Sequence, residues 1–139
     1  MIKTHKDLKK SIPNFNRFHQ SLLVTKEVVD TGELSEFYCR KLFRLKRVKP
    51  WNAAIDAIDP NGKKVEIKHR SMTGKTPAGM KVHLKKIDYL LYVELDKKLL
   101  PVKIFKINAK DITPLRGGRV SFRKAFRNGK AQVVFDGRM

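Results

Sequence analysis

The chain has 139 residues, of which 41% are hydrophobic, so it is long enough and apolar enough to fold as one domain with its own core. Its 32 Lys and Arg residues outnumber 13 Asp and Glu residues, giving a formal net charge of +19. Because such an excess repels itself in a compact chain, we expect a polyanionic partner, nucleic acid first and an acidic membrane surface second. No apolar run reaches the roughly 20 residues of a spanning helix, and the N-terminus lacks the apolar stretch of a signal peptide, so we expect no membrane insertion.

The cysteine content points to a cytoplasmic protein. Cys39 is the only cysteine, which excludes an intrachain disulfide and a cysteine-rich zinc site. It falls inside a helix pattern, where a lone cysteine is typical of a small buried hydrophobe rather than a nucleophile. The four histidines show no metal-ligand spacing.

The N-terminal third is predicted to be helical. Residues 1–13 are basic and polar and are interpreted as a basic arm or a short helix, and residues 14–29 carry apolar side chains at helical spacing. Asp30 stands three residues before Glu33, a start signal for a second helix whose apolar stripe faces a sheet. Glu36 lies away from that stripe, in line with Cys39, on a second and partly apolar face. A carboxylate there needs a partner, and Arg40 at i+4 is one candidate.

A hairpin over residues 54–68 is the central prediction. Residues 44–50 form a basic connector to it, ending before Trp51, which either caps the core or stacks on a base. Pro60, Asn61 and Gly62 suit a three-residue turn, which pairs Asp59 with Lys63. Continuing outward, this register pairs Ile58 with Lys64, Asp56 with Glu66 and Ala54 with Lys68, and points Ile55, Ala57, Val65 and Ile67 to a core face.

The two facing carboxylates are the notable feature of this hairpin. Side chains directly opposite lie roughly 4.5–5.5 Å apart, and like charges repel there. Asp56 and Glu66 therefore need a cation, either Lys68 or a divalent metal ion. The alternative is a half-exposed hairpin with a charged solvent side and no chemistry.

The second half of the chain is predicted to supply strands and basic surface. Residues 70–82 form a loop containing Lys75 and Lys81, residues 87–95 form a strand buried on both faces, and residues 100–107 form a further strand. Residues 110–113 are interpreted as a helical turn, 116–119 as a basic loop, 122–126 as a helix and 132–135 as a last strand. The cations predicted to contact nucleic acid are Arg70, Lys75, Lys81, Arg119, Arg123, Lys124 and Arg127.

The order of these features resembles the PD-(D/E)xK nuclease superfamily. Its site consists of an aspartate ending one strand and an acid-x-lysine on the next, here Asp56 and Glu66-Ile67-Lys68. Gly32 to Glu36 also resembles the helix of small Holliday-junction-resolvase-type nucleases. Ile55 replaces the proline that names the motif, and Asp59 competes with Asp56, although the register points Asp59 to the other face.

The resemblance implies an α/β fold with a restriction endonuclease-like core, a mixed central β-sheet flanked by helices, in a single domain spanning residues 1–139. It implies a DNA endonuclease dependent on Mg²⁺ or Mn²⁺, with the metal held by Asp56, Glu66, the carbonyl of Ile67 and Glu36. Lys68 would act on the attacking water. Glu33 is the alternative to Glu36, and His69 and Arg70 would contact phosphate.

Three function classes remain open at this point. The first is a structure-selective endonuclease working as a homodimer. The second is a non-catalytic nucleic-acid-binding protein on a nuclease-like fold. The third, suggested by charge alone, is an RNA-binding protein. Metal-dependent DNA cleavage would separate the first from the other two.

Overall fold

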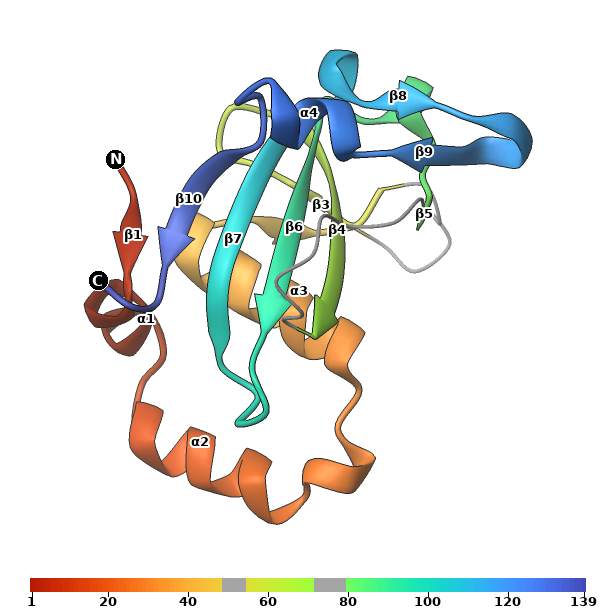
Figure 1. Cartoon of the computed structure of the whole chain (residues 1–139). Coiled ribbons are helices and arrows are strands. Elements are labelled where there is room, and N and C mark those ends of the chain that lie inside the picture. The colour runs from red at the N-terminus through yellow and green to blue at the C-terminus, as the bar shows by residue number, and fades with distance from the viewer. Residues whose placement is uncertain (49–54, 72–79) are drawn as a thin grey trace.

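The computed structural model describes residues 1–48, 55–71 and 80–139, and Figure 1 shows its course. The helical elements are α1 (His5–Ser11), α2 (Phe15–Val24), η1 (Lys26–Val28), α3 (Thr31–Phe43), η2 (Leu84–Lys86), η3 (Ala109–Asp111), η4 (Arg116–Gly118) and α4 (Arg123–Arg127). The strands are β1 (Lys3–Thr4), β2 (Lys46–Arg47), β3 (Ala57–Ile58), β4 (Lys64–Ser71), β5 (Met80–Lys81), β6 (Tyr89–Leu95), β7 (Pro101–Asn108), β8 (Thr113–Pro114), β9 (Arg119–Ser121) and β10 (Gln132–Asp136).

The described part of the chain is a mixed α/β fold built on two sheets. The large sheet has the order β1-β10-β7-β6-β4-β3-β2, and the small one has the order β5-β9-β8. Strand β6 is central: it runs parallel to β4 and antiparallel to β7. Its residues are buried on both faces, apart from the half-buried Glu94, as the nearly continuous apolar run predicted.

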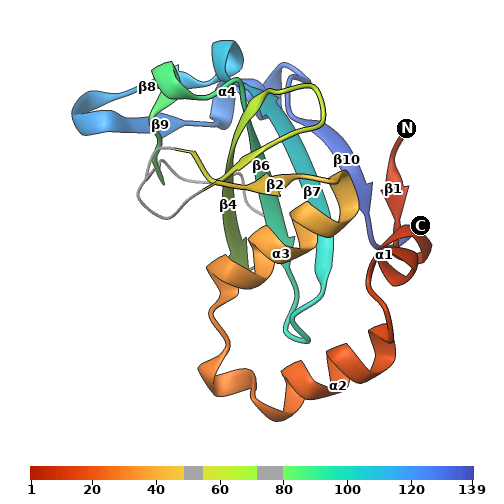
Figure 2. The ribbon, with the colours of Figure 1, turned by 180° about the vertical axis from the view of Figure 1, so that it is seen from behind.

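Helix α3 covers one face of the large sheet (Figure 2). The Asp30 carboxylate accepts the backbone N–H of Glu33 and so caps the helix. Leu34, Tyr38 and Leu42 recur every four residues and pack in one buried cluster with side chains of β4 and β6. Cys39 is fully buried within this cluster, as predicted.

The opposite face carries the small sheet and α4 at one end (Figure 1). Leu90 and Tyr92 point from β6 into a second cluster with Val120, Phe122 and Ala125. Alternation along a strand sends successive side chains to opposite faces, so β6 contributes to both cores. The sequence predicted a helix near α4 and the buried strand β6. It did not predict the small sheet, which packs in the same cluster as both.

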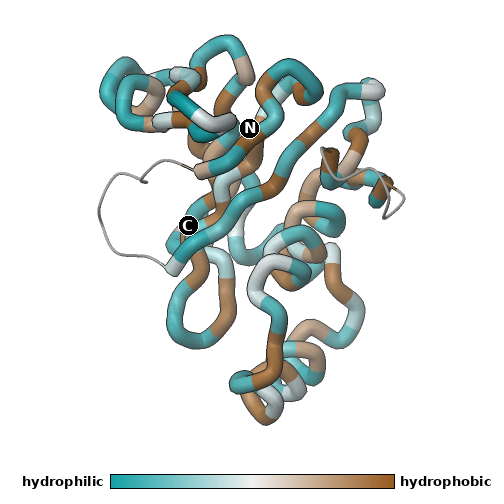
Figure 3. The backbone as a smooth tube through the Cα atoms, turned by 90° about the vertical axis from the view of Figure 1, so that its right-hand side faces the viewer, coloured by the Kyte–Doolittle hydropathy of each residue, from teal (hydrophilic) through white to brown (hydrophobic). Residues whose placement is uncertain are grey.

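The N-terminal segment is part of the fold rather than an arm. Strand β1 pairs in parallel with β10, which brings the two termini together (Figure 3). Leu8 of α1 is fully buried and Ile12 nearly so. Of the two alternatives for residues 1–13, the short helix is therefore present, and the expected basic arm is wrong.

Several boundaries also differ from the sequence prediction. The basic connector contains β2, an edge strand paired with β3. Arg70 and Ser71 belong to β4 rather than to a loop, because β4 continues alongside β6 to Leu95. The helical turn predicted at residues 110–113 is present as η3, one residue earlier, and Thr113 already belongs to β8. The loop predicted at residues 116–119 contains η4 and ends in the first residue of β9. Trp51 and Lys75 lie outside the described residues.

No helix in the described ranges is long and apolar enough to cross a membrane.

Candidate active site

The predicted hairpin register holds at the turn and ends sooner than expected. Ala57 pairs with Val65 and Ile58 with Lys64, as predicted from the turn residues, and Gly62 adopts a φ of +81°. The ladder stops at Ala57, however, so Asp56 does not stand opposite Glu66 in a regular pair. Ala54, the predicted partner of Lys68, lies outside the described residues.

Asp56 is instead attached to β4 by two hydrogen bonds. Its backbone N–H donates to the Val65 carbonyl at 2.9 Å, and its carboxylate accepts the Ile67 N–H at 2.7 Å. The carboxylate therefore lies against the peptide that links Glu66 to Ile67. This brings the two acids close together by a route that differs from simple strand pairing.

Glu66 is a buried carboxylate with one cationic partner. Its side chain forms an ion pair of 3.3 Å with Lys68, and Oε2 is buried without any hydrogen-bond partner in the described structure. Burial raises the pKa of Glu66, and the charge of Asp56 adds to that rise, whereas Lys68 and His83 oppose it. A buried oxygen without a partner carries an uncompensated desolvation cost, so a cation at this position would be stabilising.

Asp56 has a similar electrostatic environment. Burial raises its pKa, while the hydrogen bond from Ile67 and the charge of Lys68 lower it and the charge of Glu33 raises it. Asp56 and Glu66 thus repel one another and share Lys68 as the nearest cation. Lys68 is one-third exposed and can reach solvent.

Glu36 approaches Asp56 from helix α3. Burial raises the pKa of Glu36 to about 7, with further contributions from the charges of Asp56 and Glu33. Arg40 lowers it, but no ion pair joins Arg40 to Glu36 in the part of the chain described, and Nη1 of Arg40 is itself buried without a partner. The i+4 pairing considered from the sequence is therefore not formed.

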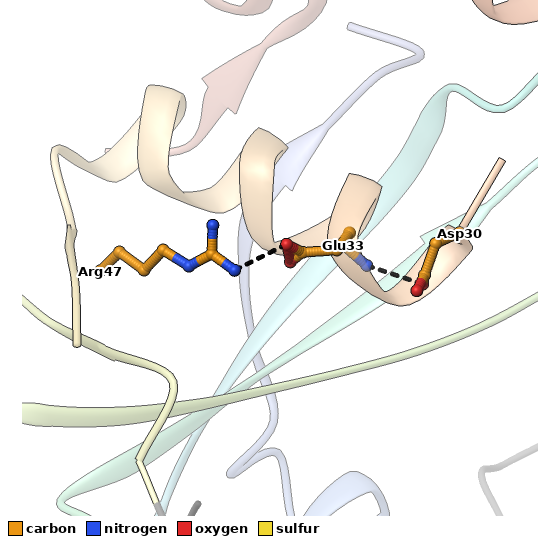
Figure 4. A network of polar contacts seen from close by, with 3 residues as sticks. All are labelled: Asp30, Glu33 and Arg47. Atoms are coloured by element: carbon orange, nitrogen blue, oxygen red, sulfur yellow. Dashed lines mark hydrogen bonds and ion pairs between the residues drawn. The ribbon is translucent and has the colours of Figure 1, made fainter. Parts of the chain in front are cut away.

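Glu33 has a different role from Glu36. Its carboxylate pairs with the Arg47 guanidinium at 2.8 Å, while its backbone N–H donates to Asp30, as Figure 4 shows. Both side chains of the ion pair are about half exposed. This surface pair links helix α3 to strand β2, while the charge of Glu33 still raises the pKa of Asp56.

His69 and Arg70 are placed by contacts within the protein. The His69 ring forms a 2.9 Å hydrogen bond with the Thr31 hydroxyl at the start of α3. Arg70 stands beside Glu94 in the β4–β6 ladder and lowers the pKa of that carboxyl, which burial raises. Their predicted phosphate contacts stay predictions.

The fit to a metal ion is partial. Within residues 1–48, 55–71 and 80–139, no three His, Cys, Asp or Glu side chains are positioned to hold one ion together. The donor chemistry nevertheless suits Mg²⁺ or Mn²⁺, because these are carboxylate oxygens, one of them buried and unpartnered. Ile67 is adjacent through its N–H bond to Asp56.

Apart from Arg70 in β4, the described cations that were predicted to contact DNA fall into two groups. Arg123, Lys124 and Arg127 are exposed on α4, and Lys81 and Arg119 are ladder partners on the small sheet. The sequence missed His83, which acts on Glu66 from the segment after β5. No spacing signal could have found it, because only the small sheet brings it near.

Comparison of the chain with protein-family models and with curated proteins finds no match.

Proposed function

We propose that this protein is a metal-dependent endonuclease that hydrolyses phosphodiester bonds in DNA, built on a restriction endonuclease-like core. The observation that carries the proposal is the hydrogen bond from Ile67 N–H to the Asp56 carboxylate, which places Asp56 beside Glu66 and Lys68. The mixed sheet and the helix bearing Glu36 support the same core.

The roles of the residues follow from their surroundings. Asp56, Glu66, Glu36 and the Ile67 carbonyl would hold the divalent ion. When bound, such an ion neutralises charge on the scissile phosphate and lowers the pKa of a bound water. Lys68 would orient that water and stabilise the negative charge of the transition state from its one-third exposed position.

DNA is the proposed substrate because of the charge distribution. The net charge of +19 supplies sequence-independent attraction to phosphates. The exposed cations of α4 would contact the DNA backbone, and positioning of this kind carries no base specificity. A homodimer that cuts both strands stays a prediction of the resemblance, and sedimentation of the free protein tests it.

The decisive experiment is cleavage of supercoiled, branched and single-stranded DNA with Mg²⁺ or Mn²⁺, repeated with chelator. We expect metal-dependent nicking of at least one substrate. Retained binding with no cutting of any substrate would contradict the enzyme proposal.

The second candidate is a basic nucleic-acid-binding protein without catalysis, binding DNA or RNA. The observation that favours it is the lack of a three-ligand cluster among the described residues. In that case Lys68 would only neutralise Glu66. Removal of either side chain would leave nucleic-acid binding unchanged.

A further inference from the structure

A pocket of about 340 Å³ lies between η2 and the small sheet. Its walls include the apolar side chains of Val82, Leu84, Leu115 and Val120. This volume is at the lower end of the roughly 300–1,000 Å³ typical of ligand sites, so it suits one small ring system rather than a folded segment.

The polar groups of this pocket are cationic. Lys85, Lys86, Arg119 and His83 also line it, and none of the lining residues in the described structure is acidic. An apolar interior with a cationic rim complements a ligand that joins a flat apolar ring to negative charge. A nucleotide has this composition, because its base stacks on apolar side chains while its phosphate attracts Lys and Arg.

The pocket is held in shape by backbone hydrogen bonds. Val82 N–H donates to the Gly118 carbonyl at 3.1 Å, Leu115 N–H to Arg119 at 2.8 Å and Lys86 N–H to His83 at 2.9 Å. These bonds fix the η2 segment against the β8–β9 hairpin. A preformed site of this kind binds without the cost of ordering its walls.

Its position relates it to the candidate active site. His83, Lys85 and Lys86 line the pocket from the η2 segment. The η2 segment is tied to the start of β4 by two bonds between Asp88 and Lys64, each of 2.8 Å. The pocket is therefore connected, through the η2 segment, to the strand that carries Glu66 and Lys68.

Leu115 supplies the remaining observation. It is a large apolar side chain that is 51% exposed at this pocket, whereas Val120, which also lines the pocket, is buried. An exposed leucine beside cations is costly to hydrate, and a stacked base would cover it.

From these observations we propose that the pocket binds one unstacked nucleobase of a single-stranded or locally opened DNA, with the adjoining phosphate at Lys85 and Lys86. The proposal rests on the nucleic-acid ligand proposed above and adds a preference for unpaired over fully paired DNA. It assigns Leu115 as the residue that contacts the base.

The test measures binding in chelator, so that cleavage plays no part. The probes are a single-stranded oligonucleotide carrying 2-aminopurine and the same sequence as a perfect duplex. Leu115→Asp should weaken single-strand binding by about tenfold, because the apolar contact with one base is lost, while duplex binding changes much less. Wild-type binding should raise 2-aminopurine emission as the base leaves its stack, and the variant should not.

Val28→Asp is the matched control, because Val28 is 83% exposed on η1 and the charge change is identical. Equal losses in the two variants, or equal losses on single strand and duplex, would overturn the base pocket. Binding to phosphatidylserine vesicles that depends on Leu115, without any effect on the oligonucleotide, would also overturn it. If the base pocket is present but no metal-dependent cutting occurs with any substrate, the nuclease proposal alone fails.

Discussion

Two aspartates three residues apart, Asp56 and Asp59, have opposite environments. The Asp59 carboxylate accepts hydrogen bonds from the N–H groups of Asn61 and Lys63 and from the Tyr89 hydroxyl. Although burial opposes the change, these bonds lower the pKa of Asp59. The Asp56 carboxylate accepts one N–H, and burial raises its pKa.

The difference separates a structural carboxylate from a candidate functional one. Asp59 stabilises the turn with bonds to its own neighbours, which is the ordinary use of Asp in turns. Asp56 is placed where its charge is opposed by Glu33 and by the nearby Glu36 and Glu66. A sequence-only choice between them depended on strand register, and the hydrogen bonds now give an independent reason to prefer Asp56.

The largest expected effect tests this contrast directly. Asp56→Asn should reduce metal-dependent cleavage by more than about 100-fold, because it removes a proposed metal ligand. Its stability in urea should be unchanged or higher, since one of several mutually repelling carboxylates is neutralised. Cleavage of a plasmid substrate and urea unfolding are the two measurements.

Asp59→Asn is the matched substitution and should show the reverse pattern. Cleavage should stay within a few-fold of wild type, while unfolding becomes easier by about 1–3 kcal/mol because charged hydrogen bonds in the turn are weakened. If Asp59→Asn abolished cleavage and Asp56→Asn did not, the assignment of the two aspartates would be wrong.

The second prediction concerns Lys68. Lys68→Ala should lower cleavage by about 100-fold, because it removes the cation closest to both acids. Lys64→Ala, on the exposed start of the same strand, is the control for loss of one positive charge and should change cleavage little. Salt-dependent DNA binding, measured by anisotropy, should be similar in both variants.

The third prediction uses the raised pKa of Glu36. Because the pKa of Glu36 is about 7 in the folded state and ordinarily 4.5, the folded state binds more protons between those two pH values. Stability without metal should therefore fall as pH rises through this window, a cost fully present above pH 7 and absent below about pH 4.5. Glu36→Gln should raise stability at pH 8 by about 1–2 kcal/mol, after allowing for solvent screening at a half-buried group.

Glu33→Gln is the control for that measurement. Glu33 is paired with Arg47 at the surface, so its removal should change stability by less than about 1 kcal/mol with no pH window near 7. Urea unfolding of both variants at pH 5 and pH 8 makes the comparison. If the free energy of unfolding depended on pH identically in wild type and Glu36→Gln, the raised pKa of Glu36 would be ruled out.

The smallest effect is expected for the cations of α4, which are proposed to contact the DNA backbone. Replacing Arg123 and Arg127 by Ala should weaken binding to all DNA sequences alike and reduce the salt slope by about 1 per residue. Lys9 and Lys10, exposed on α1, provide a matched double substitution. A salt slope unchanged by the α4 variant would remove α4 from the proposed DNA surface.

Local patterns predicted much of this arrangement. Pro60, Asn61 and Gly62 set the register of the Ala57–Val65 pair, and the Asp30 cap placed the start of α3. Both depend on neighbours in sequence, where backbone preferences are strong. The β6 strand was also recognisable, because burial on both faces leaves a continuous apolar run.

Contacts between distant segments were not predictable in the same way. The Arg47–Glu33 pair, the Thr31–His69 bond and the proximity of His83 to Glu66 depend on how elements pack. Asp56 shows the limit most clearly: the sequence indicated that it meets Glu66, yet the contact is made by a side chain bonded to the Ile67 backbone. Register alone contains no information about where a strand ends.

The pairing of β1 with β10 has a consequence for how the chain is made. Lys3 and Thr4 lie beside Phe135 and Asp136, so β1 acquires its neighbour only after the residues up to Asp136 have been synthesised. Until then Leu8 has an incomplete set of packing partners, and one edge of the sheet is unformed. Closing so long a loop costs conformational entropy, which makes the formation of this edge a late step of folding.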